Sequence, residues 1–332
     1  MHQLIEELYQ GKDLSLEQSQ ELFEAIIQGQ VDPLLLSAAL TALKIKGETA
    51  DEVSGAAKAL LAHAAPFPSI DAEFADIVGT GGDGSNTFNI STTAAFVAAA
   101  CGVKVAKHGN RGVSSKSGSS DLLDAFGISL DLPAAEAKKA VEELGIAFLF
   151  APQYHQGVRH AMPVRQALKT RTIFNVLGPL INPARPQIQL MGVYDPALIP
   201  VLAKSLQKMG LKRAAVVNGS GLDEVAIHGP TQVAEIKNGE ITHYTLTPED
   251  FGVETYPLSS IVGGEPEENR AIVTDILTGK GSDAQMAAVA VNVALLLRLF
   301  GQEDLKQNTA QALDVMRQGK AFSLVQALAQ RG

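Results

Sequence analysis

The chain has 332 residues, of which 46% are hydrophobic, and its formal net charge at pH 7 is −9. This length allows a large buried core and two domains, and the acidic balance argues against a general nucleic-acid-binding surface. The longest apolar stretch, residues 286–297, is interrupted by Asn292 and is too short to cross a bilayer. The single cysteine, Cys101, excludes an intramolecular disulfide and a metal site of several cysteines. We therefore expect a cytoplasmic protein that binds neither membranes nor nucleic acid.

The first seventy residues contain helix signals and little that resembles a strand. Residues 15–18 and 49–52 are capping boxes, and Asp32-Pro33 is an N-cap followed by a first-turn proline. We expect a small α-helical domain over residues 1–70, joined by helices from about residues 163–185.

From residue 71 onward, apolar runs of strand length alternate with helical periods. The runs are residues 77–78, 103–106, 146–150, 190–193 and 214–217. This alternation predicts an α/β domain over residues 71–332, with a largely parallel central sheet flanked by helices. Asn238-Gly239 lies between two alternating segments and predicts an antiparallel hairpin, so the sheet should be mixed. Helices over residues 285–300 and 305–316 should complete the domain.

The most informative segment, residues 79–92, reads GTGGDGSNTFNIST and joins a strand-like run to a helix-like run. Glycines let backbone N–H groups converge on phosphate oxygens, and Ser91 and Thr92 begin a helix whose positive end favours the same anion. Asp83 would repel an anion unless a metal ion or a substrate hydroxyl stood between them. The segment therefore predicts a site for a sugar phosphate together with a divalent cation.

Two familiar phosphate loops fit this segment poorly. Gly79, Gly81 and Gly84 match the G-x-G-x-x-G spacing of dinucleotide-binding folds, but residues 101–107 supply lysines where such folds place an acidic residue. A Walker loop requires a lysine after its glycines, and residues 84–87 contain none. Neither a nicotinamide cofactor nor an ATPase loop is expected.

A second loop, residues 107–121, follows the run at residues 103–106 and combines cations, hydroxyls and glycines. Lys107 and Arg111 provide positive charge, and Ser119 near a helix start can bind phosphate through the terminal amides. Two such loops at successive strand ends indicate a ligand with two separate phosphate groups.

A third turn, residues 218–224, follows the run at residues 214–217 and ends in Asp223-Glu224. Magnesium on a phosphorylated substrate usually takes one or two protein carboxylates, so this pair can hold it together with the Ser91 hydroxyl. An Asp-Glu pair in a loop is also common as a solvated surface feature, and we presume that these side chains are exposed. Parallel strands would bring this turn to the same sheet edge as the two loops.

These segments together resemble the anthranilate phosphoribosyltransferases of tryptophan biosynthesis, and the resemblance covers essentially the whole chain. It is carried by residues 79–83, 89–92, 107–111 and 223–224. The resemblance implies a homodimer whose subunits have a small α-helical domain and a larger α/β domain, the fold shared with pyrimidine nucleoside phosphorylases. It implies a metal-dependent reaction in which anthranilate and phosphoribosyl pyrophosphate (PRPP) give N-(5-phosphoribosyl)anthranilate and pyrophosphate. Association with an anthranilate synthase amidotransferase is left open.

The resemblance also implies individual residue functions. PRPP would be held by Gly79, Gly82, Asp83, Thr87, Asn89, Ile90, Ser91, Thr92, Lys107, Ser115 and Ser119. Anthranilate would contact Gly79, His108, Asn110 and Arg165. Ser91, Asp223 and Glu224 would hold Mg²⁺, two ions per subunit, and Lys107, Asp223 and Glu224 would be the catalytic groups. From the residues alone, Arg165 looks like an exposed arginine at an ordinary helix start, and His155 and His160 look structural.

Two alternatives share this architecture. A pyrimidine nucleoside phosphorylase would carry a lysine shortly after the first glycine loop, whereas residues 85–87 are uncharged. A non-catalytic relative that binds nucleic acid fits poorly with the intact Asp223-Glu224 pair and the acidic net charge.

Overall fold

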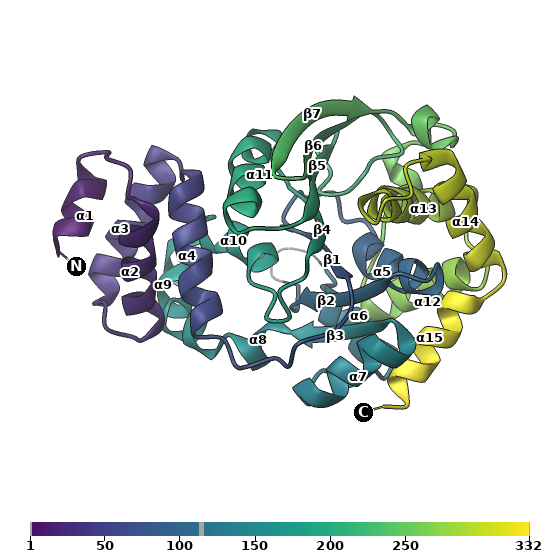
Figure 1. Ribbon diagram of the computed structural model, residues 1–332, viewed down its shortest axis with the longest axis horizontal. Helices are drawn as coiled ribbons and strands as arrows, with labels where there is room; N and C mark the ends of the chain where they lie inside the picture. The colour runs from purple at the N-terminus through teal and green to yellow at the C-terminus, as the bar shows by residue number, and fades with distance from the viewer. Residues whose placement is uncertain (1, 113–115, 332) are drawn as a thin grey trace.

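The computed structural model describes residues 2–112 and 116–331. Figure 1 shows a small all-helical lobe, which contains the N-terminus, beside a larger lobe built on a sheet. None of the helices in these described ranges is long and apolar enough to cross a bilayer.

The small lobe begins with helices whose ends are set by the predicted caps. Its first four helices are α1 (His2–Tyr9), α2 (Leu16–Ile27), α3 (Pro33–Lys46) and α4 (Ala50–Ala62). Ser15 and Thr49 form capping boxes on α2 and α4, and the Asp32 side chain caps α3. Two helices from later in the chain, α9 (Met162–Leu168) and α10 (Phe174–Leu177), contribute Val164 and Phe174 to the same buried cluster.

The large lobe contains a seven-stranded sheet of order β3-β2-β1-β4-β5-β6-β7. The strands are β1 (Phe74–Gly79), β2 (Lys104–Gly109), β3 (Ile146–Phe150), β4 (Ile188–Gly192), β5 (Arg213–Gly219), β6 (Thr231–Lys237) and β7 (Glu240–Leu246). The first five strands pair in parallel, whereas β5–β6 and β6–β7 are antiparallel. Asn238 and Gly239, with φ of 54° and 78°, form the predicted hairpin turn. The predicted mixed, largely parallel sheet is therefore confirmed.

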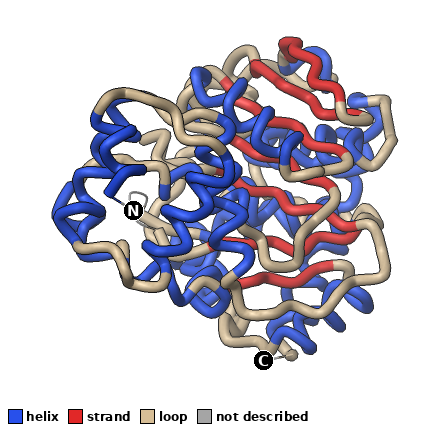
Figure 2. The backbone as a smooth tube through the Cα atoms, turned by 60° about the vertical axis from the view of Figure 1, so that its left-hand side comes forward, coloured by secondary structure: helices blue, strands red, loops and turns tan. Residues whose placement is uncertain are grey.

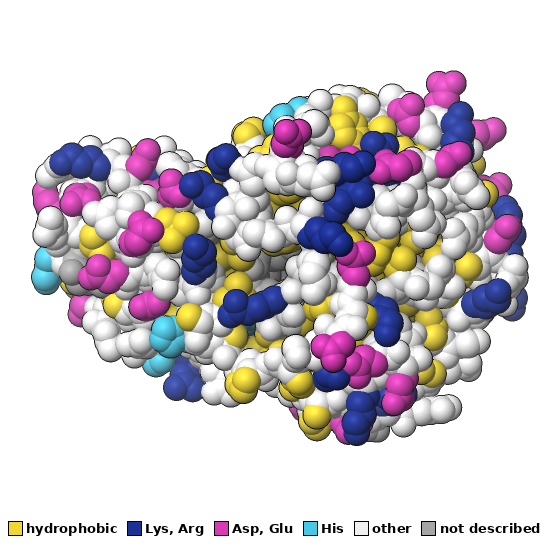
Figure 3. All heavy atoms as spheres, in the orientation of Figure 1, with side chains coloured by type: hydrophobic (Ala, Val, Ile, Leu, Met, Phe, Trp, Pro, Cys, Tyr) yellow, Lys and Arg dark blue, Asp and Glu magenta, His cyan; other side chains and the backbone are white. Residues whose placement is uncertain are grey.

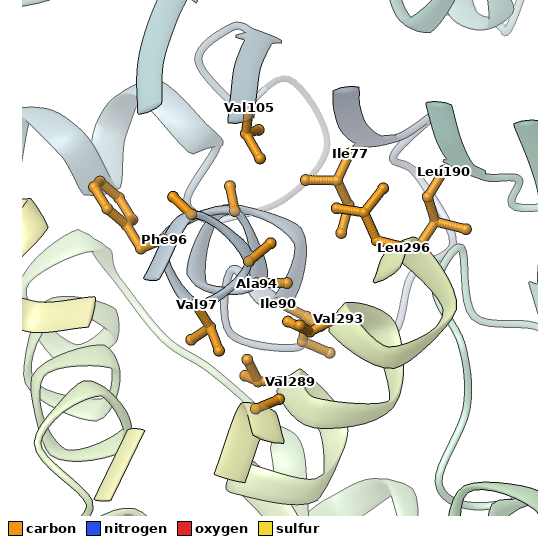
Figure 4. Close-up of a cluster of buried hydrophobic side chains, with 14 of the residues drawn as sticks. Ile77, Ile90, Ala94, Phe96, Val97, Val105, Leu190, Val289, Val293 and Leu296 are labelled. Atoms are coloured by element: carbon orange, nitrogen blue, oxygen red, sulfur yellow. The ribbon is translucent and has the colours of Figure 1, made fainter. Parts of the chain in front are cut away.

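Helices cover both faces of the sheet, as the tube in Figure 2 shows. They are α5 (Ile90–Ala100), α6 (Ser119–Ala125), α7 (Ala134–Leu144), α8 (Ala151–Tyr154), α11 (Ile199–Lys208), α12 (Pro266–Leu277), α13 (Asp283–Leu299), α14 (Leu305–Arg317) and α15 (Lys320–Ala329). Figure 4 shows Ile77 and Leu190 on the strands facing Ile90 of α5 and Val293 of α13. On the other face, α11 and the small lobe share a second buried cluster with β4, β5 and β6.

The sheet divides between β1 and β2 toward their carboxyl ends. β1 stays paired with β4 as far as Gly79, and β2 stays paired with β3 as far as Gly109. By contrast, the described residues of β1 pair with those of β2 only at Phe74–Lys104 and Ala75–Val105. We call this divergence the β1–β2 fork.

Candidate active site

The three predicted loops leave the carboxyl ends of parallel strands and meet at one edge of the sheet. The first follows β1 and leads to α5, the second follows β2 and leads to α6, and the third follows β5. The Gly81 N–H donates to Asp223 Oδ2 at 2.6 Å, and the Asp223 N–H donates to Asp83 Oδ2 at 3.2 Å. The first and third loops are therefore in direct contact across more than a hundred residues of sequence.

This close approach explains the glycine at position 79. A Cβ added to Gly79 would lie 2.3 Å from Asp223 Oδ2, which is shorter than any tolerable contact. Gly82 is required for a different reason, because its φ of 77° lies in the left-handed region that favours glycine. The first loop is thus shaped to touch a carboxylate, which its Gly81 amide binds.

Glu224 of the acidic pair is buried and attached to the start of α5, whereas Asp223 is half-buried against the glycine loop. Glu224 is 9% exposed, and its Oε1 accepts hydrogen bonds from the Ser91 N–H, at 3.1 Å, and from the Ser91 hydroxyl. The expectation of exposed side chains at Asp223 and Glu224 is wrong, because the turn folds back under the glycine loop. Burial, the largest cause, raises the pKa of Glu224 to about 7, although its contact with Ser91 opposes the rise. Burial and the neighbouring carboxylates Glu224 and Asp83 also raise the pKa of Asp223 well above its usual value.

These carboxylates have the properties of a divalent-cation site that depends on a substrate. Within the described residues, no group of three or more His, Cys, Asp or Glu side chains could hold a metal ion alone. Mg²⁺ does not require such a cage, since it binds through one or two carboxylates together with water and substrate phosphates. The raised pKa values indicate negative charge that the protein does not neutralise by itself. The donor set therefore fits Mg²⁺.

Lys107 is a strand residue, not the loop residue that we expected. It lies in β2, is 4% exposed, and donates from Nζ to the Ile77 carbonyl oxygen at 2.6 Å across the β1–β2 fork. Burial lowers the pKa of Lys107, and the charges of Asp76, Glu224 and Asp223 oppose that shift. The ammonium group therefore lies inside a field of carboxylates, near the acidic pair.

His108 is also a residue of β2 and is buried against the segment that follows α10. Its Nδ1 lies 3.2 Å from the Gly178 carbonyl oxygen, and its ring centroid lies 5.4 Å from that of His155. Burial and the proximity of His155 lower the pKa of His108 to about 3, so the ring is neutral at physiological pH. His155 Nε2 lies 2.6 Å from the Ile181 carbonyl oxygen, which agrees with the structural function expected for it.

The second loop is held together by an aspartate that the sequence analysis did not single out. Asp121 Oδ2 accepts from the N–H groups of Gly112 and Gly118, at 2.9 and 2.8 Å, and Arg111 pairs with Asp121 Oδ1 at 3.1 Å. The Ser119 hydroxyl donates to the Asn110 carbonyl oxygen at 3.2 Å. Arg111 is therefore already paired within its own loop.

The remaining predicted PRPP contacts lie around the same edge. Asn89 donates to the Ser117 carbonyl oxygen at 3.0 Å and so ties the first loop to the second. Ile90 and Thr92 have buried side chains at the start of α5, and Thr87 forms an isolated β-bridge with Val262. Ser115, which we expected to bind PRPP, lies outside the described residues.

Arg165 lies on α9, on the small-lobe side, and is not the exposed arginine that local sequence suggested. Its Cζ is 5.2 Å from the ring centroid of Phe174, and its Nη1 is 3.8 Å from Met162 Sδ. Burial lowers its pKa, and no ion pair is formed by Arg165 with any described residue. The guanidinium is thus half-buried on an apolar surface without a protein carboxylate beside it.

Sequence reasoning also missed Arg171, which follows α9. Its guanidinium lies 3.7 Å from the Tyr194 ring centroid and donates to the Gly82 carbonyl oxygen. Nothing in its local sequence signals this contact, because the partners lie far away along the chain. Figure 3 shows Lys and Arg side chains around the depression between the two lobes, against an otherwise mixed surface.

A largely parallel sheet with two glycine-rich loops and an acidic pair at the carboxyl edge of its parallel strands is typical of enzymes that bind phosphorylated ligands with a divalent cation. Comparison with known proteins then specifies the family. Residues 2–64 match the helical bundle domain of a glycosyl transferase family, and residues 71–322 match its a/b domain. The chain belongs to this family, among the anthranilate phosphoribosyltransferases.

The similarity to individual members extends over whole chains. The anthranilate phosphoribosyltransferase of Vibrio cholerae serotype O1 (strain ATCC 39541 / Classical Ogawa 395 / O395) is 72% identical over 332 residues, which is 100% of both chains. The crystal structure of the Thermus thermophilus enzyme is 39% identical, with a TM-score of 0.94, over 99% of this chain and 98% of that one. The Saccharomyces cerevisiae enzyme in complex with PRPP and Mg is 30% identical, with a TM-score of 0.87, over 95% and 92%. The same yeast enzyme in complex with 4-fluoroanthranilate is 29% identical, with a TM-score of 0.89, over 99% and 96%.

Proposed function

We propose that this protein transfers the phosphoribosyl group of PRPP to the amino group of anthranilate, with release of pyrophosphate, in tryptophan biosynthesis. Full-length relatives bear this activity in their names, and the yeast relative has been solved with PRPP and Mg and with an anthranilate analogue. The observation that carries the proposal is the contact between the glycine loop and the acidic pair, through Gly81 and Asp223. This contact places the glycine loop, which we propose binds the anionic substrate, beside carboxylates that suit a divalent cation.

PRPP binds at the carboxyl edge of the sheet in this proposal. The contributing residues are Gly79, Gly82, Asp83, Thr87, Asn89, Ile90, Ser91, Thr92, Lys107, Ser115 and Ser119. Because Ile90 and Thr92 have buried side chains, their contribution is limited to backbone groups at the start of α5. Lys107 contributes positive charge from inside the fork, which favours the developing negative charge of the leaving group.

Ser91, Asp223 and Glu224 would hold Mg²⁺, and we propose two ions per subunit. When bound, Mg²⁺ neutralises charge on the pyrophosphate leaving group. The chain's own contribution is to keep Glu224 fixed against Ser91 and Asp223 fixed against the Gly81 amide, so that the carboxylates are preorganised.

Anthranilate binds between the lobes, near Gly79, His108, Asn110 and Arg165. Arg165 supplies an unpaired positive charge suited to a carboxylate, and His108 supplies a neutral ring. An arylamine is neutral at pH 7 and has an available lone pair, so orientation near the ribose C1 replaces a dedicated base. The phosphorylase alternative is not favoured, because the full-length relatives carry the transferase name and residues 85–87 are uncharged.

We also infer a division into a helical domain, residues 1–70 with helices from residues 163–185, and an α/β domain, residues 71–332. Leu34 and Ile45 lie on α3 and are 81% and 80% exposed, so this helix presents apolar surface suited to a second copy of the chain. We propose a homodimer on that basis. The cytoplasmic location stays a prediction from composition.

The proposed function is tested by following anthranilate fluorescence in the presence of PRPP and Mg²⁺. Consumption of anthranilate that stops on chelation of Mg²⁺ is the expected result. Absence of consumption by the folded protein, or metal-independent turnover at full rate, would contradict the proposal.

A further inference from the structure

A buried carboxylate lies inside the sheet, directly below the candidate active site. Asp76 is the third residue of β1 and is 0% exposed. An isolated carboxylate at such a position strongly destabilises the folded chain, so its retention requires partners. None of the functions proposed above uses it.

The partners of Asp76 are groups that the β1–β2 ladder leaves unpaired. Asp76 Oδ1 accepts from the His108 N–H at 3.4 Å, and Asp76 Oδ2 accepts from Asn182 Nδ2 at 2.9 Å. The same Asn182 amide donates to the Ala106 carbonyl oxygen at 2.8 Å. Two backbone groups of β2 are thus bound by side chains beyond the point where β1 and β2 separate.

The third contact across the fork is made by Lys107 itself, from Nζ to the Ile77 carbonyl oxygen. Backbone N–H and C=O groups on both strands are therefore hydrogen-bonded to side chains where the strands are too far apart to bond to each other. The first glycine loop departs from β1 and the second loop departs from β2 on the two sides of this fork. The width of the fork therefore contributes to the separation of the two loops, which the contact between Asn89 and Ser117 also joins.

Asn182 also fixes the fork to the chain that returns from the small lobe. Its Oδ1 accepts from the Ala184 N–H at 3.0 Å, and it follows the turn η2 (Gly178–Leu180), whose Gly178 carbonyl contacts His108. The amide is oriented by these contacts, with its donor side toward Asp76 and Ala106. Asp76 and Asn182 thus form one preoriented unit.

We propose that Asp76 and Asn182 are positioning residues that hold the β1–β2 fork open and fix the β2 backbone around Lys107 for phosphoribosyl transfer. This inference rests on the proposed function. Asp76 touches no reacting atom. It acts through the His108 N–H, and hence through the peptide that joins Lys107 to His108, and its charge also favours the charged form of Lys107.

Asp76→Asn tests the proposal with almost no change in volume. The His108 N–H and the Asn182 amide reach different oxygens of Asp76, and the substituted side chain has an NH2 group in place of one of them. One of the two donors then faces another donor. Asn182→Ala removes the amide from the other side and keeps the carboxylate. The matched control is Glu235→Gln, which neutralises a carboxylate that is 3% exposed and bonded to Tyr244 at 2.5 Å, on β6, three strands from β1.

We expect kcat/KM for PRPP to fall roughly tenfold to a hundredfold in Asp76→Asn and in Asn182→Ala, because small displacements of a positioning group have effects of this size. KM for PRPP should rise, whereas a loss of folded enzyme alone lowers apparent kcat and leaves KM unchanged. Amide hydrogen exchange in residues 104–109 should become faster in both variants. Glu235→Gln should keep the wild-type KM and the wild-type exchange in β2, even if it melts at a lower temperature.

The proposal would be overturned if Asp76→Asn and Asn182→Ala fold and match Glu235→Gln both in KM for PRPP and in the rate of amide hydrogen exchange in β2. If Asp76→Asn does not fold, Asn182→Ala decides by the same criteria. An inactive wild-type protein would instead contradict the proposed function, and the exchange measurement together with PRPP–Mg²⁺ titration calorimetry would still test the positioning.

Discussion

Arg165→Ala should weaken the binding of anthranilate selectively. The wild-type guanidinium is half-buried over Phe174, its pKa is lowered by burial, and no described residue forms an ion pair with it. A carboxylate that reaches this group gains a charge-assisted hydrogen bond without displacing a protein partner. Such a bond contributes about 1.5 to 3 kcal/mol, which corresponds to roughly tenfold to a hundredfold weaker apparent binding when it is lost.

Steady-state kinetics with each substrate varied in turn measures this effect. KM for anthranilate should rise while KM for PRPP changes little, because PRPP is assigned to the loops at the sheet edge. Arg165→Lys should recover part of the loss, since a point charge lacks the planar fork of guanidinium. Arg159→Ala is the matched control, because Arg159 is an exposed arginine on the preceding turn η1 (Gln156–His160) and its removal makes the same change in net charge.

A folded Arg165→Ala enzyme that keeps its anthranilate KM would contradict the contact between Arg165 and anthranilate. Equal losses for both substrates would also contradict it, because they would mean that Arg165 supports the lobe and does not contact the acceptor. Loss of the contact with Phe174 should lower the melting temperature slightly, so the comparison belongs at a temperature where both variants are folded.

Three further predictions concern groups elsewhere in the chain. The double variant Asp223→Asn with Glu224→Gln should lose Mg²⁺-dependent activity and keep or raise its melting temperature. Burial raises the pKa of both carboxyls, so neutral amides remove the free-energy cost of burying two negative charges. Unchanged dependence on Mg²⁺ in kinetic titrations would exclude the pair as ligands. Burial raises the pKa of the Cys101 thiol to about 12. Ellman's reagent at pH 8 should therefore react far more slowly with the native protein than with the urea-unfolded protein. Equal reaction rates would show that the native protein has an accessible thiolate. Glu52→Ala should lower the free energy of unfolding, measured by urea titration, by about 3 kcal/mol. The reason is that the buried Glu52 carboxylate accepts from the Leu14 and Thr49 amides and pairs with Lys46 at 2.8 Å. A loss below about 1 kcal/mol would show that these contacts contribute no more than a surface ion pair.

Local sequence was sufficient to predict the helices and strands and the loops that carry the chemistry. Capping boxes at Ser15 and Thr49 and the turn at Asn238 act through neighbours a few residues away, so local sequence was sufficient to place them. The alternation of strand and helix patterns predicted the mixed sheet for the same reason. The glycine loop was recognised because its backbone requirements are met by glycine alone.

The burial of the site residues, their partners and the shape of the site depend on tertiary contacts. Glu224 was expected to be exposed and is buried, because the turn folds beneath a loop more than a hundred residues earlier in the chain. Arg165 has no local signal of function, and the only local signal at Asp76 is a carboxylate inside the apolar strand at residues 74–79. Their environments are made by Phe174 and Asn182, whose positions depend on how the chain returns from the small lobe. Local propensity cannot encode such contacts, since the free energy of burying a charge depends on groups that only the folded chain brings together.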